Sequence, residues 1–238
     1  FLVGINAENN IPLVKRIYNE GHEIGNHTFT HPNIAKVSRK RAVLEMDATR
    51  LLIECITGHS TILFRAPYNA DFEPQKAEEL IPVAIARQKN YLDIGESIDP
   101  LDWVPGTPAD SIVARVIRRK AEMTSENLSG NIILLHDAGG ETREATVEAL
   151  PRIIHYFKER GYTFTTIADL LGKKKDDLMP PVPHGSGYYL LQLNYLVAII
   201  AYLGSHLLAS IFILFIILSL LRILLMAVFA SKQHYWEK

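Results

Sequence analysis

The sequence contains a single cysteine, Cys55, among 238 residues. One cysteine cannot form an intramolecular disulfide, and it excludes a zinc site built from several thiolates. The apolar periodicity around Cys55 predicts that the thiol packs inside a helix rather than serving as a nucleophile. A cysteine-poor domain is compatible with either side of a membrane, so the redox compartment stays open.

An excess of charge of either sign is also lacking. The chain has 25 Lys and Arg against 26 Asp and Glu, for a formal net charge of −1. No basic field therefore points to nucleic acid, and we expect no nucleic-acid partner.

Features of a signal peptide are lacking in Phe1–Ile5, which has no charged segment before it and no cleavage site after it, so we do not expect this stretch to be one. Phe1–Ile5 instead predicts a buried strand, so we expect the chain to begin inside a domain that is truncated at its N-terminus. The polar tail 231–238 has no terminating feature, and the chain can continue beyond Lys238.

Short apolar runs alternate with amphipathic stretches from Phe1 to Leu171. The runs that predict strands are Phe1–Ile5, Ile62–Phe64, Tyr91–Ile98, Ile132–Leu135 and Tyr162–Thr165. The stretches that predict helices are Asn10–Glu20, Ser38–Gly58, Pro74–Lys89 with a break or kink at Pro82, Ala109–Met123 and Thr142–Arg160. This alternation predicts an α/β fold, either a parallel sheet or a (β/α) barrel, with function at the C-terminal strand ends.

One of these helices has clear end signals and a predicted buried face. Ser38 is suited to cap its start, and Gly58 to end it. The spacing of its apolar residues predicts that Leu44, Leu51, Leu52 and Cys55 point inward.

The composition changes after residue 171. Residues 172–187 combine the charged run Lys173–Asp177 with three prolines, which predicts a solvated linker. Residues 188–230 form a membrane segment, in which 207–229 is the best span because about 20 apolar residues cross a bilayer. Tyr188–Tyr202 is less apolar, and either lies in the membrane interface or forms a second span.

Charges near the span give opposing indications of its orientation. Arg222, Lys232 and Lys238 weakly favour a cytoplasmic C-terminus, whereas Lys173–Lys175 on the other side oppose it. We expect a protein of the cell membrane with its N-terminal domain outside the cytoplasm.

Two histidines, His27 and His31, lie in a short segment that ends at Pro32. Neutral imidazoles are common zinc ligands, and two of them from one turn can chelate a divalent metal. The neighbouring threonines and Pro32 predict a loop after a strand. A pair of surface histidines is the alternative that this spacing alone leaves open.

Polar residues also follow two further predicted strands. Arg65 ends an apolar run, where a guanidinium can hold a carboxylate in a bidentate pair. His136 and Asp137 end another, but successive strand residues face opposite ways and are not expected to pair. An acid from the preceding strand exit, Asp99 or Asp102, is a better partner that would keep His136 protonated as a general acid.

Four segments in this order resemble the polysaccharide deacetylase family, also called the NodB homology domain or carbohydrate esterase family 4. They are His27-Thr-Phe-Thr-His31, Arg65-Ala-Pro-Tyr68, Asp99-Pro-Leu-Asp102-Trp103 and Leu134-Leu135-His136-Asp137. The resemblance covers residues 1–171 and implies a distorted (β/α) barrel followed by a C-terminal transmembrane helix. A fifth motif of the family, Thr-Phe-Asp-Asp, has no counterpart in the chain.

The resemblance implies a role for each matching residue. His27 and His31 would bind a divalent metal, usually zinc, and Arg65 would orient the catalytic base. The Tyr68 backbone N–H would stabilise the oxyanion. Trp103 and Leu134 would line the pocket for the acetyl methyl group. His136 would be the general acid, tuned by Asp102 or Asp99.

The implied reaction is hydrolysis of N-acetyl groups in an N-acetylglucosamine-containing glycan, which would be the substrate partner, with membrane lipid contacting 207–229. The missing motif supplies the base and the third metal ligand, so we expect the chain as given to be inactive by itself. The alternatives are a non-catalytic carbohydrate-binding module, or the front half of a larger membrane protein fused to a glycosyltransferase beyond Lys238.

Overall fold

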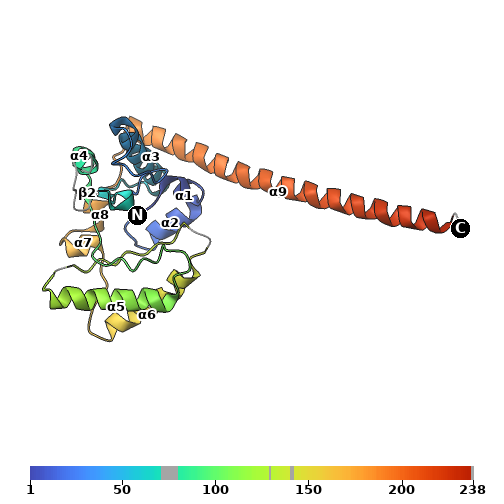
Figure 1. Cartoon of the computed structure of the whole chain (residues 1–238). Helices are drawn as coiled ribbons and strands as arrows, with labels where there is room; N and C mark the ends of the chain where they lie inside the picture. The colour runs from blue at the N-terminus through green and yellow to red at the C-terminus, as the bar shows by residue number, and fades with distance from the viewer. Residues whose placement is uncertain (71–79, 129, 140–141, 237–238) are drawn as a thin grey trace.

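The computed structural model describes residues 1–70, 80–128, 130–139 and 142–236 (Figure 1). Its helices are α1 (Gly4–Glu8), α2 (Ile11–Asn19), α3 (Arg39–Thr57), α4 (Leu80–Gln88), α5 (Ala109–Ser125), α6 (Glu144–Lys158), α7 (Ile167–Leu170), α8 (Lys175–Leu178) and α9 (Ser186–Trp236). A 3-10 helix η1 (Pro67–Asn69) and the strands β1 (Leu63–Phe64) and β2 (Leu92–Asp93) complete the elements. Helices α1–α8 gather around the short strands, and α9 extends far beyond them (Figure 1).

A short parallel array forms the centre of the domain. β1 pairs with β2 in parallel register, with Leu63 opposite Leu92. Isolated parallel bridges extend this array from Phe64 to Asn26 and from Asn26 to Leu2, and a separate parallel bridge joins Ile98 to Ile133. The expected parallel arrangement is therefore present, but its regular strands are only two residues long.

Four of the predicted strands need correction. The run Tyr91–Ile98 contains only β2, Leu92–Asp93, and an isolated bridge at Ile98. Only Leu2 of the first run bridges a neighbour, because Gly4 and Ile5 donate their N–H groups to the carbonyls of Thr28 and Phe29 and start α1 there. The run Ile132–Leu135 keeps a single bridge, at Ile133. Within the described part 142–236, the run Tyr162–Thr165 is not a strand.

The predicted helices are largely confirmed. α3 begins after Ser38, whose hydroxyl accepts the Arg41 N–H at 3.3 Å, and ends at Gly58 in the left-handed conformation with φ 74°. Leu52 and Cys55 are buried as predicted, but Leu44 and Leu51 are 67% and 45% exposed.

The buried face of α3 explains this correction. Besides Leu52 and Cys55 it includes Ala42, Glu45, Met46, Thr49, Ile53 and Ile56, which recur at helical spacing. A face that includes a threonine is not the most hydrophobic one, so apolar periodicity selected the wrong leucines.

Pro82 lies inside a described helix. α4 runs from Leu80 to Gln88 and contains Pro82. The part 74–79 of the predicted helix lies outside the described residues, so the break or kink predicted at Pro82 stays a prediction.

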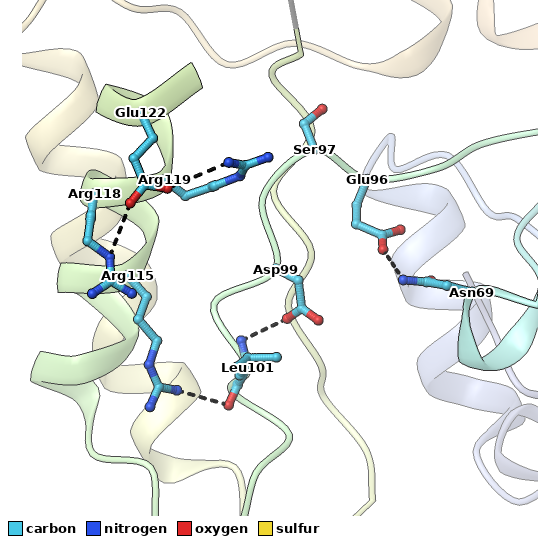
Figure 2. A pocket seen from close by; sticks show the side chains of 9 residues that line it. All are labelled: Asn69, Glu96, Ser97, Asp99, Leu101, Arg115, Arg118, Arg119 and Glu122. Carbon is cyan, nitrogen blue, oxygen red and sulfur yellow. Dashed lines mark hydrogen bonds and ion pairs between the residues drawn. The ribbon is translucent and has the colours of Figure 1, made fainter. Parts of the chain in front are cut away.

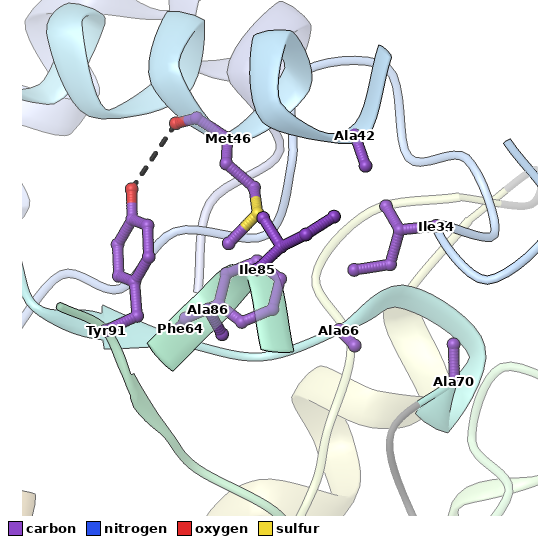
Figure 3. Packing of buried hydrophobic residues seen from close by; sticks show 9 residues of the cluster. All are labelled: Ile34, Ala42, Met46, Phe64, Ala66, Ala70, Ile85, Ala86 and Tyr91. Carbon is purple, nitrogen blue, oxygen red and sulfur yellow. Dashed lines mark hydrogen bonds between the residues drawn. The ribbon is translucent and has the colours of Figure 1, made fainter. Parts of the chain in front are cut away.

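One hydrophobic cluster fastens β1 between α3 and α4. Phe64 is fully buried among Met46 of α3 and Ile85 of α4, and the Tyr91 ring lies 5.4 Å from the Phe64 ring (Figure 3). The other members are Ile34, Ala42, Ala66, Ala70 and Ala86. Because Arg65 and Tyr68 follow β1 directly, this cluster fixes where the chain leaves the sheet.

The predicted linker is ordered against the domain. Leu178 and Met179 are 3% and 0% exposed, and Ile24 donates its N–H to the Met179 sulfur at 3.1 Å. The segment 178–182, here called the strap, runs antiparallel to residues 58–62 through the bonds Ser60 N–H to Pro180 O and Val182 N–H to Gly58 O. The strap leads α9 onto α3.

α9 is one continuous helix with two environments. Its first part packs on a second cluster, here called the α9 cluster, which consists of Ala7, Ile11, Val14, Ile24, Leu52, Ile53, Ile56 and Met179. Its later part projects away from the domain (Figure 1). Among the described residues, one segment, Gly187–Ser231 of α9, is long and apolar enough to cross a membrane.

Candidate active site

His27 and His31 lie together in the loop that follows the bridge at Asn26. Their ring centroids are 4.9 Å apart. His27 Nδ1 lies 2.7 Å from the Arg65 carbonyl oxygen. A carbonyl can only accept, so the neutral imidazole carries its proton on Nδ1 and leaves the Nε2 lone pair available.

Burial keeps both imidazoles neutral. It lowers the pKa of His27 to about 3, although the hydrogen bond to the Arg65 carbonyl opposes this shift and the His31 charge adds to it. The pKa of His31 is also lowered, first by burial and further by the nearby charge of His136. Neutral imidazoles are the form that binds a metal ion.

The histidine loop has an unusual backbone. Thr28 and His31 have φ values of +63° and +59°, which residues other than glycine rarely adopt. Thr28 is fully buried, and its hydroxyl has no hydrogen-bond partner in the part of the chain that the structure describes. Such strained backbone persists only where surrounding contacts fix it, and it is typical of functional loops.

Two buried polar side chains supply those contacts. Glu45 of α3 accepts the N–H groups of Phe29 and Thr30 at 3.1 and 2.7 Å, and the Thr30 hydroxyl at 2.7 Å. Asn26 accepts the Thr28 N–H at 2.9 Å and donates to the Met46 carbonyl at 2.7 Å. Burial acts to raise the pKa of Glu45, but these bonds and Arg41 outweigh it and the pKa is lowered.

Arg65 is held in the core beside the histidine loop. Its Nε donates to the Ile94 carbonyl at 2.8 Å, and Nη2 donates to the Gly95 carbonyl at 3.1 Å. Glu96 lies 3.9 Å from Nε, and the Phe1 ring centroid lies 4.4 Å from the guanidinium carbon. Arg65 therefore faces Glu96, a carboxylate that the sequence reasoning did not single out.

The half-buried His136 pairs with the buried Asp102. The His136 Nδ1 lies 2.7 Å from one Asp102 carboxylate oxygen, and the His136 backbone N–H donates to the other at 2.8 Å. Thr146 of α6 donates its hydroxyl to the same second oxygen at 2.9 Å. Burial acts to raise the pKa of Asp102, but these three bonds to the charged form outweigh it and the pKa is lowered.

The structure selects Asp102 over Asp99 as the partner of His136. Asp99 instead accepts the Leu101 N–H at 2.7 Å and the Trp103 indole N–H at 3.4 Å within its own loop. The expectation that Asp99 tunes His136 is therefore wrong. Asp99 stabilises the turn that directs Asp102 inward, because its carboxylate bonds the backbone two residues ahead.

Three further predicted residues surround this pair of sites. Tyr68 has φ +61° in η1, and its ring lies 4.9 Å from the His31 ring. Trp103 is 49% exposed, and Leu134 is half-buried with its N–H bonded to the Ile98 carbonyl at 2.9 Å. Their individual roles at the site stay predictions.

A polar cleft of about 370 Å³ lies beside these residues (Figure 2). Asn69, Glu96 and Asp99 line one side, while Arg115 and Arg119 come from α5 on the other. Ser97, Leu101, Arg118 and Glu122 complete the lining. None of the three site histidines is among the lining residues, so the cleft does not contain the histidine sites.

The candidate metal donors number two among the described residues. His27 and His31 present unprotonated nitrogens, and no group of three or more His, Cys, Asp or Glu suited to a metal occurs in the described ranges. Catalytic zinc sites usually have three protein ligands. The donor chemistry fits zinc, but two imidazoles need a further ligand to hold it.

Sequence reasoning missed the residues that position the site. Glu45 and Thr146 act through hydrogen bonds to residues that are distant in the sequence. Asn26 directly precedes His27 and bonds within the same loop. Glu45 and Thr146 are polar residues on buried helix faces. A buried polar residue on an apolar face is the one signal that could have found them.

Comparison with known proteins gives a consistent picture. The family profile described as polysaccharide deacetylase matches residues 1–80. Two peptidoglycan-N-acetylglucosamine deacetylases of Bacillus cereus are similar to the chain. One is 33% identical over 176 residues, which are 74% of this chain and 58% of the relative. The other is 34% identical over 178 residues, which are 73% of this chain and 75% of the relative.

Solved structures agree with these relatives. The crystal structure of a peptidoglycan N-acetylglucosamine deacetylase in complex with 4-naphthalen-1-yl-N-oxidanyl-benzamide has a TM-score of 0.62 and 32% identity, covering 74% of this chain and 75% of that chain. A CE4 family pseudoenzyme from Bacillus anthracis has a TM-score of 0.58 and 29% identity, covering 72% of this chain and 54% of that chain.

Proposed function

Because this chain belongs to the polysaccharide deacetylase family, we propose that it forms part of a metal-dependent enzyme that removes N-acetyl groups from an N-acetylglucosamine-containing glycan. The chain spans 58% of the first relative above, so the activity is proposed for the protein that carries the chain. Both curated relatives above are peptidoglycan deacetylases by name, which supports this class of substrate.

The observation that carries the proposal is the pair of histidine arrangements that the chain forms. The His27 and His31 rings lie 4.9 Å apart, and His136 Nδ1 lies 2.7 Å from the Asp102 carboxylate. The first pair suits metal binding and the second suits proton transfer.

His27 and His31 would hold the divalent metal, and their imidazole donors favour zinc. The chemistry supplied at that position would be polarisation of the acetamide carbonyl and a lowered pKa for a bound water. The Arg65 carbonyl fixes the His27 ring, since it accepts the Nδ1 proton at 2.7 Å and directs Nε2 away from itself.

His136 would protonate the departing amine from Nε2. Asp102 accepts the Nδ1 proton of His136, and its negative charge stabilises the imidazolium form that a general acid requires. Arg65 would orient the base, the Tyr68 N–H would stabilise the oxyanion, and Trp103 and Leu134 would contact the acetyl methyl group. The products would be acetate and a free amino sugar.

We also propose that α9 anchors the protein in the cell membrane through residues 207–229, with the deacetylase domain 1–171 outside the cytoplasm. Its segment Gly187–Ser231 has the length and composition of a membrane span. The stretch 178–221 contains no Asp, Glu, Lys or Arg. A glycan of the cell wall would be reached from the outer side of the membrane.

Acetate release from N-acetylated chito-oligosaccharides or peptidoglycan-type glycans tests the enzyme proposal. The protein is assayed with and without a chelator, and its zinc content is measured. We expect His27→Ala to lower zinc content and acetate release, whereas His22→Ala, an exposed histidine of the same segment, should change neither. Unchanged zinc content and activity in His27→Ala would contradict the site assignment.

A non-catalytic carbohydrate-binding module is the second candidate. The similarity to a CE4 family pseudoenzyme favours it. Binding of chito-oligosaccharides without acetate release, in protein supplied with zinc, would support this candidate over the enzyme.

A further inference from the structure

α9 is too long for one membrane span. Its apolar segment, Gly187–Ser231, has 45 residues, which at about 1.5 Å per residue extend about 68 Å. The hydrocarbon core of a bilayer is about 30 Å thick. If 207–229 cross the membrane, the first 20 or so residues of α9 need another location.

This first half of α9 has two faces. Leu191, Tyr195, Ala198, Ile199 and Tyr202 turn toward the domain, where Leu191 is 4% exposed and the others pack on the α9 cluster. On the opposite face Leu190, Leu193, Val197 and Ile200 are 59%, 55%, 59% and 60% exposed. We call this second row the outer stripe.

The outer stripe continues into the proposed membrane span. Leu207, Ile211, Leu214 and Leu218 prolong the same helical row, and each is at least 54% exposed. The stripe thus presents the same aliphatic surface as the part of α9 that would contact lipid tails.

The outer stripe fits lipid better than another helix. Close helix packing in membranes uses small residues, and the row from Leu190 to Leu218 contains one, Gly204, while the stripe residues named above are Leu, Val and Ile. Tyrosines favour the membrane interface; Tyr188 and the exposed Tyr189 stand at the start of this first half, and none occurs in 207–229.

We infer that residues 188–203 lie along the bilayer surface, with the outer stripe among the acyl chains and the deacetylase domain on the opposite side of the helix. The inference rests on the membrane anchoring proposed above and adds a second lipid contact. It requires α9 to bend before residue 207. Gly204 and Ser205 form a Gly/Ser pair, and the Ser205 hydroxyl donates to the Tyr202 carbonyl at 2.8 Å; both features are typical of helix bends.

Site-directed spin labelling of the whole chain in vesicles of phosphatidylethanolamine and phosphatidylglycerol tests this inference. Cysteines are introduced one at a time at Val197, Ile217 and Val147 in a Cys55→Ala background. Collision rates of the label with lipid-soluble oxygen and with a water-soluble nickel complex show its surroundings. Val147 on α6 is the matched control, because it is a valine of similar exposure, 69% against 59%, on the domain itself.

We expect the labels at Val197 and Ile217 to favour oxygen and the label at Val147 to favour the nickel complex. If Ile217 favours oxygen but Val197 behaves like Val147, the surface contact is refuted while the anchor stands. If Ile217 also favours nickel, the anchoring proposal itself fails. Spin–spin broadening at Val197 would mean that a second copy of the chain covers the stripe, which would also refute the lipid contact.

Discussion

The hydrogen bond from Thr146 to Asp102 allows a quantitative test of the Asp102–His136 pair. Thr146→Val keeps the shape of the side chain and removes the hydroxyl that donates at 2.9 Å to the buried carboxylate. A hydrogen bond to a charged group contributes about 1.5–3 kcal/mol to stability. At about 2–4 °C per kcal/mol for a domain of this size, the unfolding midpoint should fall by about 3–12 °C.

The effect should depend on pH in a defined direction. The pKa of Asp102 is lowered in the folded chain, so its bonds stabilise the fold above the unfolded pKa, and this stabilisation is lost as the pH falls through the folded pKa. The Thr146→Val loss should therefore be largest near pH 7. It should shrink below the folded pKa of Asp102, where the bond joins two neutral groups.

Unfolding can be followed by Trp103 fluorescence in detergent, in a Trp236→Phe background, because Trp103 lies one residue from Asp102. Thr146→Ser restores the hydroxyl and is the matched control. Two results would refute the reasoning: a Thr146→Val protein as stable as the parent at pH 7, or a Thr146→Ser protein destabilised as much as Thr146→Val.

Three further predictions address other parts of the molecule. Glu45→Ala removes the acceptor of two backbone N–H groups in the histidine loop, at a cost of about 1–3 kcal/mol each. Calorimetric titration should therefore show weaker zinc binding for Glu45→Ala than for Glu45→Gln, which keeps an acceptor oxygen. Equal affinities of the two variants would argue against this positioning role of Glu45. Gly4→Ala places a methyl group 2.2 Å from the Phe29 ring and should lower the denaturation midpoint more than Gly58→Ala, which meets open space and carries only the strain of φ +74°. Burial raises the pKa of Cys55 to about 11, so only about one thiol in a thousand is ionised at pH 8 and iodoacetamide should not label the folded protein; rapid labelling would contradict this packing.

The sequence was informative about the helices because their signals are local. Ser38 and Gly58 define the ends of α3 by hydrogen bonding and backbone conformation within a few residues. The buried face of α3 depends on distant partners, since Glu45 is buried only because the histidine loop folds onto it. Apolar periodicity contains no information about those partners, so it predicts that Leu44 and Leu51 point inward although both are exposed.

The candidate site was predictable to the same extent. Arg65 and His136 could be found because each follows an apolar run that pairs in parallel, and His27 and His31 because two histidines of one short segment precede Pro32. The choice between Asp99 and Asp102 could not be made, because the two lie three residues apart in one loop and their directions depend on how that loop turns.

The packing of α9 on the domain also affects how the domain could be shed from a membrane. Residues 183–185 are exposed and precede α9, so a protease would find its cutting site there. One cut would not free the domain, because Tyr195, Ile199 and Tyr202 of α9 would still pack on the α9 cluster. The two fragments would stay together on the membrane, and shedding would additionally require that this contact open.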